Sequence, residues 1–233
     1  MRTFRLATYN IHNGRGVDGR YDPARTAIAI KELGAQVVAL QEVTTSSASG
    51  VSLLAHLAEA TGLHPLPGPV MKRGEREYGN GLLTEFPVSH VTNVDLSLPG
   101  HEPRGAMDIE MTIDGSPFRL INTHLGLSPF ERRAQGRRLL KLLGEAFLRP
   151  TALVGDLNGW FLTRGPWVEI RRKFGDRHHA PRTFPVFRPV AALDRIWVYP
   201  HSIRGVARVH VSPVARVASD HLPLVTNITL PPR

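Results

Sequence analysis

Short runs rich in β-branched and aromatic residues alternate along this chain with longer runs whose apolar residues have helical spacing. This repeated alternation favours an α/β sandwich over separate all-α and all-β halves. Strands are predicted at Phe4–Asn10, Val37–Gln41, Gly81–Thr84, Val88–Leu96, Ala106–Ile113, Phe118–His124, Ala152–Asp156, Arg195–Val198, Val206–Val211 and Leu224–Ile228. Helices are predicted at Pro23–Leu33, Val51–Thr61, Pro129–Phe147 and Pro166–Phe174, and loops at Leu63–Gly74 and Arg177–Pro189.

The middle of the chain carries the clearest pairing signal. Three predicted strands, Val88–Leu96, Ala106–Ile113 and Phe118–His124, follow one another closely, which indicates antiparallel neighbours. Asp114 and Gly115 between the last two form a strong hairpin turn sequence. A chain of 233 residues with 42% hydrophobic composition can bury one sizeable core, so a single domain over residues 1–233 is expected.

The composition excludes several kinds of chemistry. The chain has no cysteine, which rules out disulfides, a thiol nucleophile and a zinc–thiolate site. Catalysis would therefore use oxygen, imidazole, amide or guanidinium groups. No stretch approaches the roughly 20 apolar residues of a membrane span, and no signal-peptide core follows Met1, so a cytoplasmic protein without a transmembrane segment is expected.

The charge balance points to an anionic partner. The chain has 29 Lys and Arg against 20 Asp and Glu, a formal charge of +9. Nucleic acid and an anionic membrane surface, contacted peripherally, both fit this excess, because each rewards surface cations. A solvated surface without such a partner fits it as well, so charge does not choose among the three.

Polar residues of ligand or acid–base type follow the apolar core of one predicted strand after another. Apolar strands that deliver polar residues to one sheet edge build a site. The segments are Tyr9-Asn10-Ile11-His12, Leu40-Gln41-Glu42-Val43, Asn122-Thr123-His124-Leu125, Val154-Gly155-Asp156-Leu157-Asn158, Leu193-Asp194-Arg195-Ile196 and Ala218-Ser219-Asp220-His221.

In this order the segments resemble the endonuclease/exonuclease/phosphatase superfamily, whose fold is DNase-I-like. The most specific pieces are Gly-Asp-Leu-Asn at 155–158, Ser-Asp-His at 219–221 and Gln-Glu at 41–42. The resemblance implies a four-layer sandwich of two mixed β-sheets flanked by helices. His12 after Tyr-Asn-Ile departs from abasic-site endonucleases and is similar to sphingomyelinase-like and small bacterial members.

The resemblance also implies a hydrolase that cleaves a phosphodiester with Mg²⁺ or Mn²⁺. Hard oxygen ligands hold such an ion and leave positions open for the phosphate. By resemblance Glu42 is the principal metal ligand, and Asn10 and Asp220 complete or approach the site.

The same resemblance assigns the catalytic roles. Asp156 activates water, and Asn158, His124 and His221 stabilise charge on the phosphate, while Asp194 orients His221. Asp156 and Asn158 are two residues apart, so they would point to one side if the strand continued.

Three further residues are expected to contact substrate, each with a competing interpretation. Asn80 lies in Tyr78-Gly79-Asn80-Gly81, where a structural turn is about as well supported. Arg104 could clamp a phosphate oxygen through its planar fork or be an exposed, solvated arginine. His12 is the third.

Two substrate classes remain open, a nucleic acid and a phospholipid or small organophosphate. The charge and the basic stretch Arg132–Lys141 favour the first, and His12 and the short chain favour the second. A catalytically inactive module that binds polyanions is the alternative from a different class. The number of metal ions, the cleavage polarity and the oligomeric state do not follow from the sequence.

Overall fold

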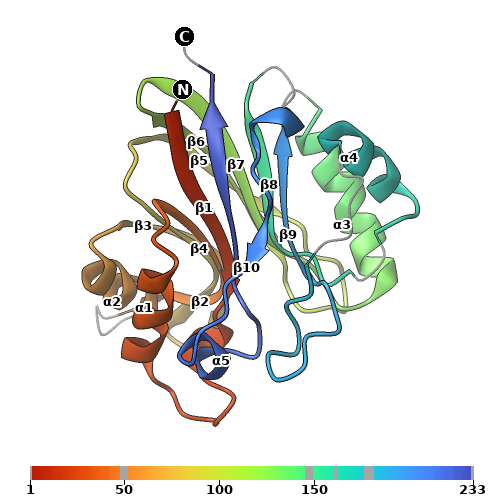
Figure 1. The fold of residues 1–233 in the computed structure, drawn as a ribbon. Coiled ribbons are helices and arrows are strands. Elements are labelled where there is room, and N and C mark those ends of the chain that lie inside the picture. The colour runs from red at the N-terminus through yellow and green to blue at the C-terminus, as the bar shows by residue number, and fades with distance from the viewer. Residues whose placement is uncertain (1, 48–51, 145–148, 160–161, 176–180, 232–233) are drawn as a thin grey trace.

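Two β-sheets pack face to face in the computed structural model, which describes residues 2–47, 52–144, 149–159, 162–175 and 181–231 (Figure 1). The first sheet has the order β10-β11-β1-β2-β4-β3, and the second β5-β6-β7-β8-β9. The first sheet consists of β1 (Arg2–Asn10), β2 (Val37–Ser47), β3 (His64–Arg73), β4 (Arg76–Thr84), β10 (Arg208–Val209) and β11 (Leu224–Leu230). The second consists of β5 (Val88–Asp95), β6 (Gly105–Ile113), β7 (Ser116–His124), β8 (Thr151–Asp156) and β9 (Asp194–Tyr199).

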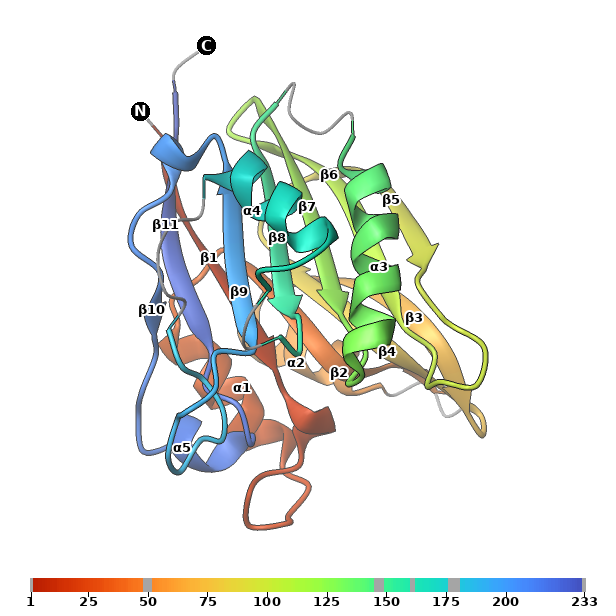
Figure 2. The ribbon, with the colours of Figure 1, turned by 90° about the vertical axis from the view of Figure 1, so that its right-hand side faces the viewer.

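Helices cover the outer face of each sheet. Helices α1 (Pro23–Glu32) and α2 (Leu53–Thr61) lie on the first sheet, and α3 (Pro129–Leu142) and α4 (Pro166–Phe174) on the second (Figures 1 and 2). Short turns at η1 (His12–Gly14), η3 (His201–Ile203) and α5 (Ala215–Ala218) complete the described elements. Both sheets are mixed, since β1–β2 and β7–β8 are parallel and the other long pairs antiparallel. The predicted four-layer DNase-I-like sandwich is therefore confirmed.

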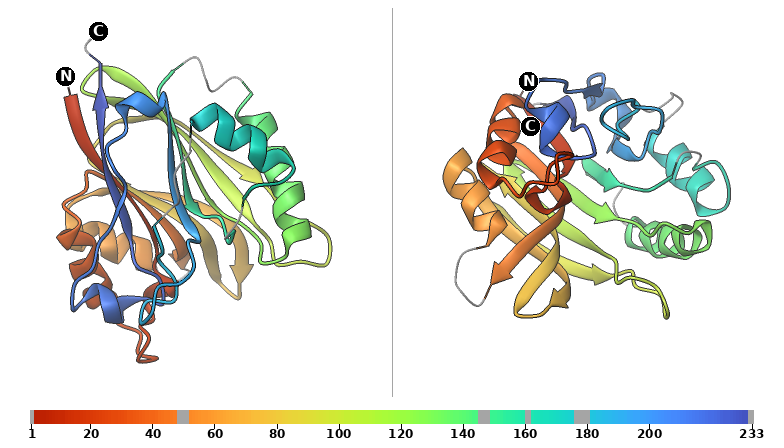
Figure 3. Two further views of the ribbon diagram at one scale, coloured as in Figure 1. Left: turned by 45° about the vertical axis from the view of Figure 1, so that its right-hand side comes forward. Right: turned by 90° about the horizontal axis from the view of Figure 1, so that it is seen from below.

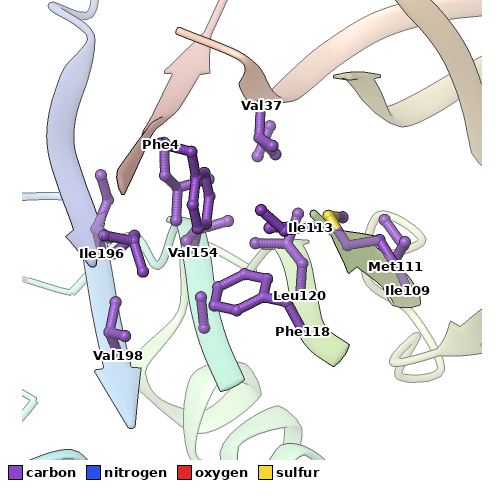
Figure 4. Packing of buried hydrophobic residues seen from close by; sticks show 14 of the residues in the cluster. Phe4, Val37, Ile109, Met111, Ile113, Phe118, Leu120, Val154, Ile196 and Val198 are labelled. Atoms are coloured by element: carbon purple, nitrogen blue, oxygen red, sulfur yellow. The ribbon is translucent and has the colours of Figure 1, made fainter. Parts of the chain in front are cut away.

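The main core lies between the two sheets. Phe4 packs edge-on against Phe118 across the sandwich, with ring centroids 5.3 Å apart (Figure 4). Successive side chains of a strand point to opposite faces. Leu6 of β1 accordingly faces the inter-sheet core, whereas its neighbour Ala7 packs in the cluster under α1 and α2. Burial on both faces explains the nearly continuous apolar runs in the sequence.

The predicted hairpins of the middle segment are confirmed. Strands β5, β6 and β7 pair antiparallel in succession. Asp114 and Gly115 join β6 to β7 with φ of 47° and 84°. Two consecutive positive φ values are what a two-residue turn of type I′ requires, so this sequence suits the turn.

The prediction of a loop at Leu63–Gly74 is wrong, because residues His64–Arg73 form the edge strand β3. Its prolines at 65, 67 and 69 suggested a loop because proline cannot donate a backbone hydrogen bond. In a strand, however, every second N–H points to the same side. Prolines at alternate positions of an edge strand leave the intervening N–H groups free to pair with β4.

Other boundaries also differ from the predictions. The segment Val206–Val211 contributes only the two residues of β10, and α3 ends at Leu142. The last predicted turn of α3 falls partly on residues 145–148, and the start of α2 on Val51, all outside the described residues. The strands β2 and β4 are longer than predicted and carry a bulged register, which matters for the site.

Candidate active site

The strand ends that carry polar residues meet at one end of the sandwich. Asn10 ends β1, His124 ends β7 and Asp156 ends β8. His124 pairs with Asp156 in parallel register, and Asp156 pairs with Asp194 at the start of antiparallel β9. These ends lie at the lower edge of the sandwich in Figures 1 and 2, and Figure 3 views that edge from below. The predicted convergence of these segments is therefore present in the structure.

Asp156 lies at the centre of the polar cluster. Its Oδ2 accepts a hydrogen bond from Asn10 Nδ2 at 3.1 Å, and it lies 3.5 Å from His124 Nε2 and 3.6 Å from His221 Nε2. Burial alone would raise the pKa of Asp156, but the two imidazoles and the hydrogen bonds hold it below its usual value. A buried, ionised carboxylate with two histidines beside it is suited to accept a proton.

Gly155, next to Asp156, is required by a close approach between strands. It has a φ of 131°, and a Cβ at this position would lie 1.9 Å from the Thr123 carbonyl oxygen. Only glycine fits this approach without moving β7. The Gly-Asp pair in the sequence therefore fixes where the Asp156 carboxylate lies relative to His124.

His221 and Asp194 are in contact, as the sequence analysis predicted. His221 Nδ1 is 2.9 Å from Asp194 Oδ2, and Thr183 Oγ1 donates to the same carboxylate. The Phe184 ring packs on the imidazole at 4.8 Å. Burial would lower the pKa of His221, but Asp194 on one side and Asp156 on the other raise it to about 10. The imidazole is therefore protonated at neutral pH and compensates both carboxylates.

Glu42 is held by two neutral donors. Its Oε1 accepts from Asn10 Nδ2 at 3.0 Å and its Oε2 from Tyr78 Oη at 3.0 Å. Burial alone would raise the pKa of Glu42. The nearby His124 and the two hydrogen bonds outweigh burial and lower this pKa below its usual value, so the carboxylate stays ionised. Glu42 has a φ of 56° where the β2–β4 register shifts, and this irregularity directs the side chain to the site.

The predicted metal ligands occupy different environments. The amide nitrogen of Asn10 donates to both the Glu42 and the Asp156 carboxylate, so one anionic group lies on each side of it. Asn10 Oδ1 accepts from the His12 backbone N–H at 3.1 Å. Asp220 is half-exposed and lies 3.8 Å from His12 Nδ1. Carboxylate and amide oxygens around an anionic centre are the donors that Mg²⁺ and Mn²⁺ prefer, so this set fits such an ion.

A second acidic group is more compact but fits a metal less well. Among the described residues, Asp156, Asp194 and His221 have ligand atoms within 4.8 Å of one another. Without an ion the two carboxylates hold His221 protonated, and a metal bound here would have to displace that proton. This group is better described as a buried carboxylate–imidazolium–carboxylate array.

Asn158 reaches the site by a turn and not by continuation of the strand. It has a φ of 49°, and its backbone N–H donates to Asp156 Oδ1 at 2.9 Å. Its Nδ2 lies 3.1 Å from His124 Nε2 and donates to the Leu125 carbonyl. The prediction that strand geometry aligns Asp156 and Asn158 is thus wrong, because β8 ends at Asp156. The two side chains still face the same cluster.

Burial lowers the pKa of His124.

Asn80 is not in a turn and Arg104 is not solvated, and contact of either residue with substrate stays a prediction. Asn80 lies within β4 and not in a turn, and its Nδ2 donates to the Gly105 carbonyl at 3.0 Å. Arg104 is 7% exposed, so it is not a solvated arginine, and it pairs with Glu102 at 2.7 Å. Both residues line a small hollow that also includes His124. His12, by contrast, lies at the rim beside Asp220.

Sequence reasoning missed three supporting residues. Tyr78 bonds Glu42, Thr183 bonds Asp194, and Ser219 Oγ donates to the Asn10 carbonyl at 2.7 Å. Tyr78 and Ser219 lie inside segments that the sequence had singled out, but it assigned neither of them a role. Thr183 lies in a segment predicted as a loop, and the sequence assigned it no role.

Comparisons with known proteins agree with this fold. The model of the Endonuclease/Exonuclease/phosphatase family matches residues 7–221. The protein YbhP of Escherichia coli K12, described as uncharacterized, is 28% identical over 98% of this chain and 97% of its own length.

Solved structures share the fold. The endonuclease/exonuclease/phosphatase from Beutenbergia cavernae has a TM-score of 0.75 at 24% identity, over 99% of this chain and 72% of that chain. The one from Bacteroides vulgatus has a TM-score of 0.76 at 18% identity, over 99% and 100%. TDP2 of D. rerio, humanized by 14 mutations, has a TM-score of 0.72 at 17% identity, over 98% and 99%.

Proposed function

Because the chain belongs to the endonuclease/exonuclease/phosphatase family, whose members are generally hydrolases, we propose that it is a Mg²⁺- or Mn²⁺-dependent phosphodiesterase. The observation that carries this proposal is the position of Asp156, whose carboxylate accepts from Asn10 and lies beside both His124 and His221. One ionised carboxylate among two imidazoles and two amides is suited to activate water next to a phosphate.

The reaction is a single in-line displacement. The water oxygen forms a bond to phosphorus as the bond to the leaving oxygen breaks, Asp156 accepts the proton that the water loses, and the leaving alkoxide takes a proton from solvent. The protonated His221 donates to a non-bridging phosphate oxygen, where charge develops. Asp194 keeps Nδ1 of that ring occupied, which leaves Nε2 to face the substrate. No covalent enzyme intermediate forms.

Asn158 and His124 complete the phosphate site. Asn158 Nδ2 and His124 Nε2 are 3.1 Å apart, so both can reach one phosphate oxygen placed beside Asp156. The bonds from Asn158 to the Leu125 carbonyl and to Asp156 hold its amide in place, so little reorganisation is needed for its other N–H to turn from His124 Nε2 to the phosphate as charge develops.

The divalent ion would be held by Glu42, with Asn10 and Asp220 completing or approaching its site. When bound, such an ion neutralises the phosphate and stabilises the leaving oxygen. Glu42 suits the role because two donors orient its carboxylate and keep it ionised. An Asn10 ligand would bind through its oxygen, and this requires the amide to leave its present bond to the His12 N–H.

Exposed apolar side chains in the segments that follow site residues favour a phospholipid or small organophosphate over a nucleic acid. Leu127 is 72% exposed and Phe130 69%, and they lie three and six residues after His124. Phe187 is 78% exposed and follows Phe184, which packs on His221. Exposed apolar groups around a polar site suit an amphiphilic substrate.

Among the described residues no helix is long and apolar enough to span a membrane.

A nucleic acid remains the second candidate substrate because the chain carries a charge of +9. A nuclease that tracks a phosphate backbone binds through counterion release, so its affinity falls steeply as salt rises. The inactive polyanion-binding module is the third candidate, and the complete set of acidic, amide and imidazole groups in one cluster counts against it.

The proposal is tested by a substrate panel. Nucleic acids, phospholipid vesicles and small diesters are incubated with the protein in Mg²⁺, Mn²⁺ or EDTA, and the Glu42→Gln variant is the matched control for metal dependence. Hydrolysis in Mg²⁺ or Mn²⁺ that EDTA and Glu42→Gln both remove is the expected result. Hydrolysis that persists in EDTA would overturn metal dependence. No hydrolysis across the panel would overturn the enzyme and favour the binding module.

A further inference from the structure

The positive charge of the chain is concentrated on one side of the sandwich. Helices α3 and α4 together carry eight Lys and Arg against two Glu, a net charge of +6 out of the +9 of the whole chain. Helices α1 and α2, on the opposite side, carry two Lys and Arg and two Glu, and so have no net charge. Figure 2 shows α3 and α4 outside the second sheet. One outer layer is therefore strongly cationic, and the other is neutral.

One face of α3 presents a regular stripe of side chains to solvent. Its four members are exposed and lie three or four residues apart, so they follow one another along the helix: Phe130, Arg133, Arg137 and Lys141. The buried residues of α3 lie on the opposite face. Because α3 has 14 residues, its length is about 21 Å, and the stripe extends along most of it.

The cations of this stripe have no acidic partner in the part of the chain that the structure describes. Within the layer, Lys173 pairs with Glu169 at 3.8 Å, whereas Arg133, Arg137 and Lys141 take part in no ion pair with a described residue. Their charge is therefore available to an external anionic partner.

Helices α3 and α4 pack closely enough to form one continuous layer. A Cβ at Gly136 would lie 2.8 Å from the Trp167 ring, so the absence of a side chain permits this approach. Arg133 lies beside Gly165, just before α4, where a Cβ would be 3.4 Å from its Nε. Helix α4 adds the exposed residue Val168, which is 54% exposed. The cationic surface thus also carries apolar groups.

The end of the stripe nearest the active site is apolar. Phe130 is 69% exposed, and Leu127, three residues after His124, is 72% exposed. Exposed Phe and Leu beside Lys and Arg are typical of surfaces that bind anionic bilayers, because the apolar groups enter the interface and the cations contact lipid phosphates. The phosphates of a nucleic-acid duplex would attract the cations but would leave the apolar groups in water. The combination therefore favours a bilayer.

We propose that the outer face of α3 and α4 docks on an anionic lipid bilayer, with Leu127 and Phe130 in the interface and the stripe cations against lipid phosphates. The inference deepens the proposed function, because it names the surface on which a phospholipid substrate is met. Since α3 begins five residues after His124, docking keeps the active-site edge near the bilayer.

Vesicle sedimentation tests the surface without turnover. The protein is incubated in EDTA with vesicles of phosphatidylcholine alone or of phosphatidylcholine and phosphatidylglycerol. Wild-type protein should bind the anionic vesicles and not the zwitterionic ones. Each Lys or Arg near an anionic membrane strengthens binding by about fivefold, so Arg133→Gln/Arg137→Gln/Lys141→Gln should weaken it by about 100-fold.

The matched control removes the same charge from the other side of the sandwich. Residues Lys31, Arg76 and Arg208 belong to α1, β4 and β10 and are exposed. Lys31→Gln/Arg76→Gln/Arg208→Gln should therefore bind anionic vesicles within about threefold of wild type. No binding of the wild-type protein to anionic vesicles, or equal losses in the two triple variants, would overturn the docking surface.

A tryptophan reporter separates a bilayer from a nucleic acid. Emission of Phe130→Trp, taken as the difference from wild type, should shift to shorter wavelength with anionic vesicles, because the indole leaves water. Val206→Trp, at a position 76% exposed before β10, should show no shift. Binding to duplex DNA that the α3 triple variant weakens, without vesicle binding, would overturn the bilayer and reassign the stripe to nucleic acid.

Failure of the proposed function is measured separately. Hydrolysis of bis(4-nitrophenyl) phosphate in Mg²⁺ needs no docking, so the α3 triple variant should retain wild-type turnover. Absence of that hydrolysis in the wild-type protein, together with binding to anionic vesicles, would contradict the enzyme and leave the docking surface standing. Hydrolysis without vesicle binding would leave the enzyme and overturn the docking surface alone.

Discussion

Asp194 and His221 are 27 residues apart in the chain, yet Asp194 Oδ2 lies 2.9 Å from His221 Nδ1 with both side chains buried. Strand β9 begins at Asp194, and His221 lies in the segment that enters β11. Asp194 belongs to the second sheet and His221 to the loop that leads into the first, so their contact depends on how the two sheets pack. Whether the two residues are in contact therefore depends on the geometry of the whole site.

Replacing Asp194 by Asn should lower kcat by about 10²–10⁴-fold, because the amide does not stabilise a protonated ring and can hold the wrong tautomer. The measurement is hydrolysis of bis(4-nitrophenyl) phosphate in Mg²⁺. Asp114→Asn in the β6–β7 turn is the matched control, since asparagine tolerates its φ of 47°. Equal turnover in the Asp194→Asn and Asp114→Asn proteins would remove the orienting role of Asp194.

The raised pKa of His221 makes part of the stability depend on pH. A histidine whose folded pKa lies above its unfolded value of 6.5 stabilises the fold fully below pH 6.5 and loses that contribution as pH rises to about 10. The free energy of unfolding, measured by urea denaturation in EDTA, should therefore fall for the wild-type protein relative to His221→Gln between pH 6.5 and 10. A constant difference across this window would show that the pKa is not raised.

Removing the Tyr78 hydroxyl should weaken metal binding without removing a predicted ligand. Groups that orient a ligand typically contribute about 10–100-fold to affinity, and Tyr78 Oη donates to Glu42 at 3.0 Å. We expect Tyr78→Phe to raise the Mn²⁺ dissociation constant by about that factor, measured by calorimetry. Tyr21→Phe, at a side chain that is 56% exposed, should leave it unchanged. An unaltered constant in Tyr78→Phe would mean that Glu42 is not the metal ligand.

The inter-sheet core should dominate stability. Phe118 is buried and packs on Phe4 across the sandwich, so Phe118→Ala should lower the free energy of unfolding by about 3–5 kcal/mol. Phe187→Ala, at a side chain that is 78% exposed, should change it by less than about 0.5 kcal/mol. Urea denaturation measures both, and similar losses for the two variants would contradict the packing.

Much of the fold followed from local patterns. The strands around Asn10, His124 and Asp156 were predicted because buried strands leave long apolar runs that end at polar residues. The Asp114-Gly115 turn was predicted because its two residues tolerate positive φ. These features depend on the chain segment itself, so a single sequence shows them.

Other features depend on neighbours that the sequence does not display. The strand β3 was mistaken for a loop because its prolines are tolerated only at the edge of a sheet, and edge position is a property of the assembled fold. The sequence assigned no role to Thr183 or Tyr78, because their bonds to Asp194 and Glu42 depend on the assembled fold. Burial of Arg104 likewise comes from the packing of β3 and β4 against β5 and β6.

The most direct test of the central claim is the turnover of Asp156→Asn on bis(4-nitrophenyl) phosphate in Mg²⁺, with folding checked by circular dichroism. Loss of the proton acceptor should lower kcat by about 10²–10⁴-fold, while Asp114→Asn keeps wild-type activity. A folded Asp156→Asn protein that retains activity within about threefold of wild type would contradict a reaction centred on this carboxylate.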